Sequence, residues 1–330
     1  MVCAGLAFSG TVPAQERHDV TIGYQQIYNP WKVAIVDGAF EKATGYEITW
    51  RRFDSGAKVI TAMASGEVQL ALAGSSPIAA GVSRGIDIEL VWIAEDIASA
   101  EALVVRDGAG IEAPQDLRGK RLAVPFASTT HFHTLFALEQ FGIEPGEVTI
   151  LDMQPEQIVT AWKRGDIDAA FVWDPALGEI KKTGKVLITS GLLSRWGKAT
   201  FDGIVASKSF VAANPGFMCA FIKTIAAADA AYRDHVDDWT PDSAPVRAIA
   251  KASGGNPDDV PRVLALYNFP TLEEQASRRW LGGGARGGAA RALAFTAEFL
   301  KEQKKIPTVL PDYATVVDPE WVEKVLAGGC

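Results

Sequence analysis

The sequence predicts an α/β protein of two lobes with a helical C-terminal region. From Val20 to Val105, short β-rich runs alternate with helical runs, which is typical of an open sheet with helices on both faces. Glycine, proline and charged residues gather at 106–119, and the alternation then starts again. Beyond Pro215 the pattern is almost wholly helical. The length of 330 residues agrees with about two folded units.

Turn residues bound the elements of the first α/β run. Pro30 suits a first helical turn, and Gly45, Gly66 and Gly85 suit the positions that end helices. We expect strands at 20–24, 47–53, 68–73, 88–94 and 102–105, and helices at 30–44, 57–65 and 77–84.

The second α/β run shows the same punctuation, with Gly142 and Gly165 following two helical stretches. We expect strands at 121–126, 148–153, 169–173 and 186–189, and helices at 129–141 and 155–164. The segment 200–207 is expected to be a second crossing between the lobes. Helices are then expected at 215–235, 242–253, 257–267, 272–281 and 289–304.

Composition excludes several classes of function. Apolar residues make up 48% of the chain, so a disordered protein is not expected. The net charge of −8 does not suit a nucleic-acid-binding protein or a polybasic membrane-surface protein. No apolar run in the sequence approaches the ~18 residues of a membrane span.

The N-terminal segment 1–14 has no charged side chain and ends in Val-Pro-Ala, like the end of a secretory signal that is cut short. We therefore expect export to the periplasm; a frayed apolar N-terminus or a lipoprotein signal at Cys3 are the alternatives. Cys219 lies in an apolar helical run and is expected to be a small core residue. With Cys330 it forms one distant pair, which is no disulfide framework.

Familiar catalytic and cofactor motifs are not expected to operate here. The glycines at 282–287 match G-x-G-x-x-G, but they follow 278–281 and no strand, so we interpret them as a loop before a helix. His131 and His133 lie about 200° apart on a helix and cannot share a metal ion. The sequence therefore predicts no catalytic residue, metal site or cofactor.

Two helix starts are candidates for an anion site. Segment 74–77 follows the strand 68–73, and segment 128–131 follows the strand 121–126; both are rich in hydroxyl residues. Free backbone N–H groups and the helix dipole favour an anion at such a place. Helix capping alone is the alternative, but two such sites in separate lobes suggest one anion held between them. His131 is interpreted as a polar wall of this pocket or as a capped surface residue.

Other polar and aromatic residues are expected at strand ends, where ligands of open α/β sheets bind. Gln25 and Trp173 end predicted strands, and Trp173 offers an aromatic face. Glu101 and Asp202 lie near the two crossings, as solvated charges or as partners of a ligand cation. Anion sites, carboxylates and aromatics together suit a small zwitterion.

The motifs that stand out resemble one family along 19–318, nearly the whole chain. They are Phe53-Asp54-Ser55-Gly56-Ala57, Gly74-Ser75-Ser76-Pro77, Glu101-Ala102-Leu103-Val104-Val105, Val124-Pro125-Phe126 with Ser128-Thr129-Thr130-His131, Ala161-Trp162-Lys163-Arg164-Gly165-Asp166-Ile167-Asp168, Val172-Trp173-Asp174-Pro175 and Phe299-Leu300-Lys301-Glu302-Gln303-Lys304. As a set they resemble the periplasmic binding proteins of ABC importers for taurine, alkanesulfonates and nitrate.

The resemblance implies a type-II periplasmic binding fold, with two lobes, two crossover strands and a hinged cleft, and no catalysis. It implies that Ser76 and 128–130 face a sulfonate, that Glu101 and Asp202 meet an ammonium, and that Trp173 packs on a short carbon chain. The sequence departs from taurine-binding relatives at Asp174, where they often carry a small residue. The full set of expected ligand-binding residues is Gln25, Ser75, Ser76, Glu101, Ser128, Thr129, Thr130, His131, Trp173 and Asp202.

These observations together predict a monomeric periplasmic protein that captures taurine or a related aminosulfonate and delivers it to an ABC permease. Lobe 1 is expected to comprise 19–105 and 204–330, and lobe 2 to comprise 106–203. The alternatives are a binding protein for another small sulfonate or zwitterion, and an enzyme of the pyrimidine-synthesis type on the same fold. Nitrate is a weaker candidate because it carries no cation for the carboxylates.

Overall fold

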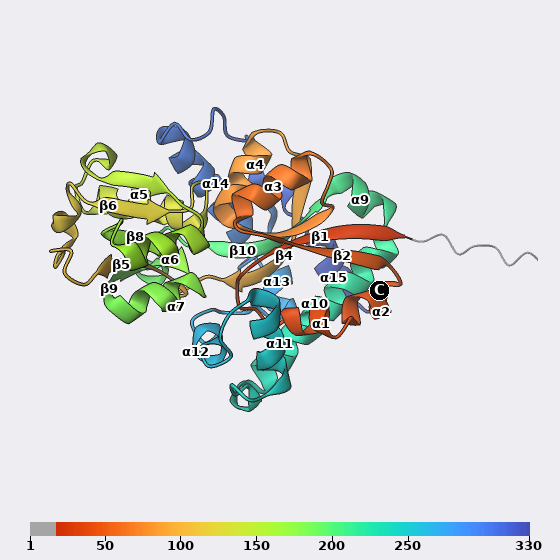
Figure 1. Ribbon diagram of the computed structural model, residues 1–330. Coiled ribbons are helices and arrows are strands. Elements are labelled where there is room, and N and C mark those ends of the chain that lie inside the picture. The colour runs from red at the N-terminus through yellow and green to blue at the C-terminus, as the bar shows by residue number, and fades with distance from the viewer. Residues whose placement is uncertain (1–17) are drawn as a thin grey trace, which may run out of the picture.

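The computed structural model describes residues 18–330, and Figure 1 shows two lobes with the yellow-green elements forming one of them. Each lobe contains a five-stranded sheet that mixes parallel and antiparallel strands. The signal-like segment 1–14 lies outside the described residues. None of the helices within 18–330 combines the length and the apolar character needed to cross a membrane.

The sheet of lobe 1 has the order β2-β1-β3-β10-β4. Its strands are β1 (Asp19–Gln25), β2 (Glu47–Phe53), β3 (Leu70–Gly74), β4 (Ile88–Asp96) and β10 (Phe201–Ser207). β1 is parallel to β2 and β3, so their carboxyl ends at Gln25, Phe53 and Gly74 lie at one sheet edge. β10 runs antiparallel between β3 and β4, and its register sets Asp202 opposite Gly74. Residues from distant parts of the chain therefore meet at this edge.

The sheet of lobe 2 repeats this plan with the order β7-β6-β8-β5-β9. Its strands are β5 (Glu101–Arg106), β6 (Arg121–Val124), β7 (Thr149–Asp152), β8 (Ala169–Trp173) and β9 (Gly184–Thr189). β6 is parallel to β7 and β8, whereas β5 is antiparallel to β8 and β9. The register sets Glu101 opposite Trp173, so the start of β5 and the end of β8 lie at the same edge of this sheet.

The strand pairing moves the predicted lobe boundaries. β5 was expected in lobe 1 but pairs entirely within the second sheet, so the first crossing lies at 97–100. β10 pairs with lobe 1 from Phe201 onward, so the return crossing lies before that residue and not at 203. The reason is that hydrogen-bonded pairing, which a local pattern does not reveal, decides which sheet a strand joins. We propose 18–96 with 201–330 as lobe 1 and 101–195 as lobe 2.

Helices cover both sheets. They are α1 (Lys32–Val36), α2 (Ala39–Thr44), α3 (Gly56–Ala64) and α4 (Ser75–Ser83) in lobe 1, α5 (Thr129–Gln140), α6 (Pro155–Arg164), α7 (Ala176–Ile180) and α8 (Ser190–Arg195) in lobe 2, and α9 (Lys208–Ala213), α10 (Pro215–Asp234), α11 (Ala244–Ser253), α12 (Val260–Leu264), α13 (Leu272–Ala276), α14 (Gly288–Glu302) and α15 (Glu320–Leu326) in the C-terminal region. The helix expected at 30–44 is broken, because Gly38 adopts a left-handed φ of 63° between α1 and α2. The helix α15 was not predicted.

The two apolar cores are joined by α14. Most buried residues form one large cluster, and a second cluster lies in lobe 2. Phe299 of α14 belongs to the second cluster, and its ring lies 5.2 Å from that of Phe132 on α5. The long helix α14 also packs against α4, so the C-terminal region contacts both lobes.

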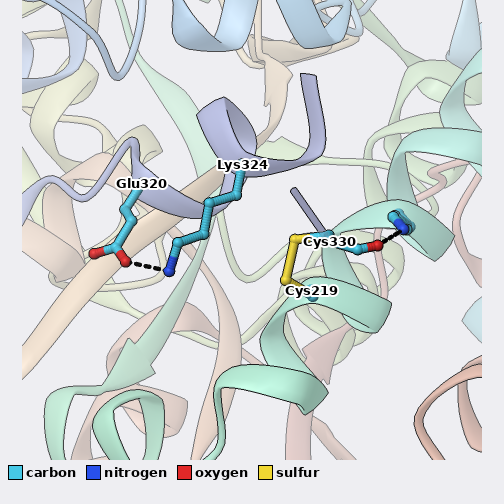
Figure 2. The surroundings of a disulfide bond; sticks show 5 residues. Cys219, Glu320, Lys324 and Cys330 are labelled. Carbon is cyan, nitrogen blue, oxygen red and sulfur yellow. Dashed lines mark hydrogen bonds and ion pairs between the residues drawn. A yellow bond between two sulfur atoms is a disulfide. The ribbon is translucent and has the colours of Figure 1, made fainter. Parts of the chain in front are cut away.

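Cys219 is not a free core residue, which corrects the prediction. Figure 2 shows its disulfide bond to Cys330, which joins α10 to the C-terminal residue. The Cα atoms lie 5.4 Å apart, although the two cysteines are separated by 111 residues in sequence. Nearby, Lys324 and Glu320 form an ion pair along α15. The bond follows from the packing of α10 against α15, which brings the chain end to Cys219.

Candidate functional site

A small polar cavity lies at the junction of the lobes. It is narrow in this structure, with a volume of about 10 Å³. Its lining comes from both lobes and consists of Gln25, Ile27, Gly56, Gly74, Pro77, Glu101, Ser128, Thr129, Trp173, Asp202 and Tyr267. A ligand held there contacts both lobes at once.

One wall of the cavity is made from helix N-termini. α3 begins at Gly56, α4 follows Gly74, and α5 follows Ser128, and all three of these residues line the cavity. The first N–H groups of a helix have no partner within the helix, and the helix dipole favours negative charge beside them. Three helix starts from both lobes thus form a wall suited to an anion that needs no proton.

Close packing at this wall requires small residues. A Cβ atom at Gly56 would lie 2.7 Å from Cγ of Pro77, and one at Gly74 would lie 2.8 Å from Cγ2 of Thr129. The backbone at Gly74 has φ −68° and ψ 157°, which any residue can adopt. Glycine is therefore needed at position 74 because of the close approach of lobe 2, not because of backbone strain.

Hydroxyl groups near this wall differ in how they are used. Ser128 accepts a hydrogen bond from the backbone N–H of His131 at 3.1 Å and donates to the carbonyl of Pro125 at 2.6 Å, so it caps α5. The buried hydroxyls of Ser55 and Ser76 have no hydrogen-bond partner in the structure. A buried hydroxyl without a partner is costly, so these two groups are candidates to bind a ligand or water.

Carboxyl groups form a second part of the lining, the carboxyl wall, which adjoins the helix starts at Gly74 and Thr129. Asp202 and Glu101 line the cavity, and Glu95 lies behind Asp202. Burial raises the pKa of Asp202 to about 7, and burial with the nearby Asp202 raises that of Glu101 to about 8. Burial and the charge of Asp202 also hold the pKa of Glu95 well above its usual range. The carboxyl groups of Asp202 and Glu95 contact each other, so repulsion between two buried charges favours a proton shared by this pair.

The carboxyl pair is held by surrounding groups. The side-chain amide of Asn29 donates to Glu95 at 3.2 Å. The buried ammonium of Lys32 donates to the backbone carbonyls of Gln25 and Ile27, and to the Ser253 hydroxyl at 2.8 Å. Lys32 thus fixes the end of β1 and the residues that follow it, which contribute Gln25 and Ile27 to the cavity.

The predicted site residues fall into two groups. Those that line the cavity are Gln25, Glu101, Ser128, Thr129, Trp173 and Asp202. Those that are buried nearby but are not part of the lining are Ser75, Ser76, Thr130 and His131.

Three residues of the second group, Ser75, Thr130 and His131, have local structural partners, whereas the Ser76 hydroxyl has none. Thr130 lies 2.8 Å from the Ser128 hydroxyl, and Ser75 accepts from the backbone N–H of Phe201 at 3.5 Å. His131 accepts from the N–H of Ala127 at 3.1 Å, and burial lowers its pKa to about 4. A hydroxyl-rich helix start therefore orients some of its side chains toward the cavity and others into the fold.

Several cavity residues were not among the predicted ligand-binding residues. Gly56 starts a helix directly after β2, so it shows the same local pattern as the two predicted helix starts. Tyr267 comes from the helical C-terminal region, and no signal around it points to a site. Asp174 does not line the cavity; its carboxylate accepts from the N–H of Gly178 at 3.0 Å at the start of α7. The departure at Asp174 thus adds no charge to the cavity wall.

Comparisons with known proteins agree with this architecture. The family model described as NMT1/THI5 like matches residues 33–238. The taurine-binding periplasmic protein of Escherichia coli K12 is 40% identical over 92% of this chain and 93% of its own length. A putative aliphatic sulfonates-binding protein of Bacillus subtilis 168 is 29% identical over 93% of this chain and 88% of its own.

A solved structure shows the same fold. The periplasmic aliphatic sulphonate binding protein SsuA of Escherichia coli superposes with a TM-score of 0.72 over 93% of this chain and all of its own, at 21% identity. Two lobes with crossing strands and a polar cavity between them define a protein of the type-II periplasmic binding fold. The chain belongs to the NMT1/THI5-like family, and the named relatives reported above are binding proteins.

Proposed function

We propose that this protein captures taurine, or a closely related small aminosulfonate, in the cavity between its lobes and presents it to an ABC permease in the periplasm. The observation that carries the proposal is that three helix starts and two carboxyl groups, Glu101 and Asp202, line the same cavity. A sulfonate stays anionic at every physiological pH and needs donors only. An ammonium needs acceptors, which the carboxyl wall supplies.

The relatives support the same ligand class. The E. coli taurine-binding protein has the highest identity of the three relatives reported above, and two others are named for aliphatic sulfonates. The wall made from helix starts therefore suits any sulfonate, whereas the carboxyl wall suits a ligand that also carries an amine. An alkanesulfonate without an amine would leave buried acceptors unpaired, at a cost of about 1–3 kcal/mol per group.

Asp202→Asn tests the role of the carboxyl wall. The substitution keeps the shape of the side chain and removes its charge from the cavity. Hydrogen bonds to charged groups contribute about 1.5–3 kcal/mol, so we expect taurine to bind about 10- to 150-fold more weakly. Binding of ethanesulfonate, which has no amine, should change far less. Calorimetric titration of both ligands against both proteins measures this, and equal losses for the two ligands would contradict an amine-reading role of Asp202.

A thermal-unfolding panel tests the ligand class without any mutation. A ligand at 100 times its dissociation constant stabilises the folded state by about 2.7 kcal/mol. We expect the largest rise in melting temperature with taurine, smaller rises with simple alkanesulfonates and β-alanine, and the smallest with nitrate and sulfate. If taurine gives no rise while another compound does, that compound replaces taurine in the proposal. Conversion of a bound compound to a product would favour the enzyme alternative.

A further inference from the structure

A chain of buried hydrogen-bonding groups leads from the cavity into lobe 2. Glu101 Oε2 lies 3.0 Å from the Ser190 hydroxyl, and that hydroxyl lies 2.9 Å from Nδ1 of His133. Nε2 of His133 lies 2.7 Å from the backbone carbonyl of Lys198. The other carboxyl oxygen, Glu101 Oε1, accepts from the Thr129 hydroxyl at 2.5 Å. Only Glu101 and Thr129 of this set line the cavity.

The hydrogen atoms in this series of hydrogen-bonding groups, from Glu101 to Lys198, can be counted. A backbone carbonyl only accepts, so Nε2 of His133 must carry a hydrogen. The contacts Glu101–Ser190 and Ser190–His133 are both of hydrogen-bond length and need two hydrogens, but the Ser190 hydroxyl has one. The second hydrogen must lie on Glu101 Oε2 or on Nδ1 of His133. An ionised Glu101 beside a neutral His133 would leave one of the two contacts as lone pair against lone pair.

The surroundings decide which end holds this hydrogen. A hydrogen on Glu101 leaves both end groups neutral, whereas one on His133 creates a fully buried ion pair, which is costly to desolvate. Burial lowers the pKa of His133 to about 4, and burial with the nearby Asp202 raises that of Glu101 to about 8. The lowered pKa of His133 and the raised pKa of Glu101 both favour the hydrogen on Glu101 at neutral pH.

The groups packed against Glu101 shift its pKa in both directions, and the upward shift is the larger. Asp202 of β10 raises the pKa of Glu101 by its charge, and Tyr267 also lies near enough to interact with it. The hydroxyls of Thr129 on α5 and Ser190 on α8 lower the pKa of Glu101 where they donate to it, by less than burial and Asp202 raise it. Lys198 contributes only its backbone carbonyl to the hydrogen-bonded series, and its ammonium lies over the rings of Phe136, Phe295 and Phe299.

We propose that Ser190 and His133 hold Glu101 in its protonated, uncharged form, so that, among residues 18–330, the negative charge facing the ligand ammonium is that of the Asp202–Glu95 pair. Glu101 then offers its Oε1 as a neutral acceptor, and His133 is a positioning residue that acts through Ser190. One ligand cation thus meets one negative charge. The ammonium part of this inference rests on the proposed function; the protonation of Glu101 does not.

Glu101→Gln and Asp202→Asn form a matched pair of variants. Glutamine keeps a carbonyl oxygen in place of Oε1 and supplies an N–H for Ser190, so it copies the protonated acid. We expect Glu101→Gln to bind taurine within about threefold of the wild type at pH 7, while Asp202→Asn loses about 10-fold or more. Equal losses in the two variants, with unchanged melting temperatures, would make Glu101 a charged partner of the ammonium and overturn the inference.

Infrared spectroscopy of the ligand-free protein tests the protonation directly. The wild-type spectrum minus that of Glu101→Gln should contain the C=O stretch of a protonated carboxylic acid at pH 6.5, and it should fade as the pH is raised above about 8. Ser190→Ala should shift this band, because the acid proton loses its acceptor, whereas a merely structural role of Ser190 would not. A difference spectrum without the band at pH 6.5 would overturn the inference.

The two failures remain distinguishable. If the wild type does not bind taurine, the proposed function fails while the infrared band still decides the state of Glu101. If taurine binds and the band is missing, the inference fails and the proposed function stands.

Discussion

Gly74→Ala places a methyl group where the two lobes meet. The new Cβ would lie 2.8 Å from Cγ2 of Thr129 in lobe 2 and 3.1 Å from Oδ1 of Asp202. The first distance is about 0.6 Å shorter than an ordinary contact of 3.4 Å. Inserting a methyl group into such a packed position costs about 1–3 kcal/mol. Because one partner belongs to the other lobe, we expect this cost to appear in lobe closure and ligand binding.

The expected magnitude is a loss of about 5- to 150-fold in taurine affinity. The backbone at Gly74 suits alanine, and a Gly→Ala change at such a position raises the free energy of unfolding by about 0.4–1 kcal/mol through the unfolded chain. We therefore expect a melting temperature of the ligand-free protein that is unchanged or slightly raised. Weaker binding together with intact stability is the signature of a closure defect.

Calorimetric titration with taurine and thermal unfolding without ligand measure the two effects. Gly146→Ala is the matched control, because no atom lies within 4 Å of the Cβ it would add in lobe 2. The control should bind taurine as the wild type does. Wild-type affinity in Gly74→Ala would refute the reasoning, since it would mean that the lobes do not need this contact distance to hold the ligand.

Two further predictions concern stability. Asp168 is partly buried, and its hydrogen bonds with the Arg121 guanidinium hold the pKa of its carboxyl below the usual value. The ionised carboxylate therefore stabilises the folded state above about pH 4, and this stabilisation is lost as the pH falls through the lowered pKa. Asp168→Asn should lower the free energy of unfolding by about 1–2 kcal/mol at pH 7. Denaturant titrations should show that the difference in unfolding free energy between wild type and variant shrinks in acid. A difference that does not change with pH would contradict the ion-pair role. Cys330→Ser opens the disulfide to Cys219 and should lower the free energy of unfolding by about 2–4 kcal/mol while taurine affinity stays unchanged, and a fall in affinity would link the C-terminus to the site.

Local patterns carried much of the fold. Strand β2 at 47–53, strand β8 at 169–173 and helix α6 at 155–164 were predicted with the bounds that the structure has. These elements are delimited by capping glycines, prolines and apolar periodicity, which act over a few residues. The helix starts at Gly74 and Ser128 follow from the same local signals, and both line the cavity.

Long-range pairing decided what local signals could not. The sheet to which β5 belongs depends on its hydrogen bonds to β8 and β9, and the Cys219–Cys330 bond depends on where α15 leaves the chain end. Neither is encoded in the residues immediately around Glu101 or Cys219. Predictions at these places were therefore shifted or wrong.

The amino-acid sequence by itself determined which chemical groups are available at the strand ends and helix starts, namely N–H donors, hydroxyls and carboxyls. Tertiary structure alone decided the state of those groups. Glu101 and Asp202 look alike as acidic residues near a crossing, yet one lies against Ser190 and the other against Glu95. Protonation depends on burial and on the partner that packing supplies, because a charge removed from water is stable only where another group compensates it.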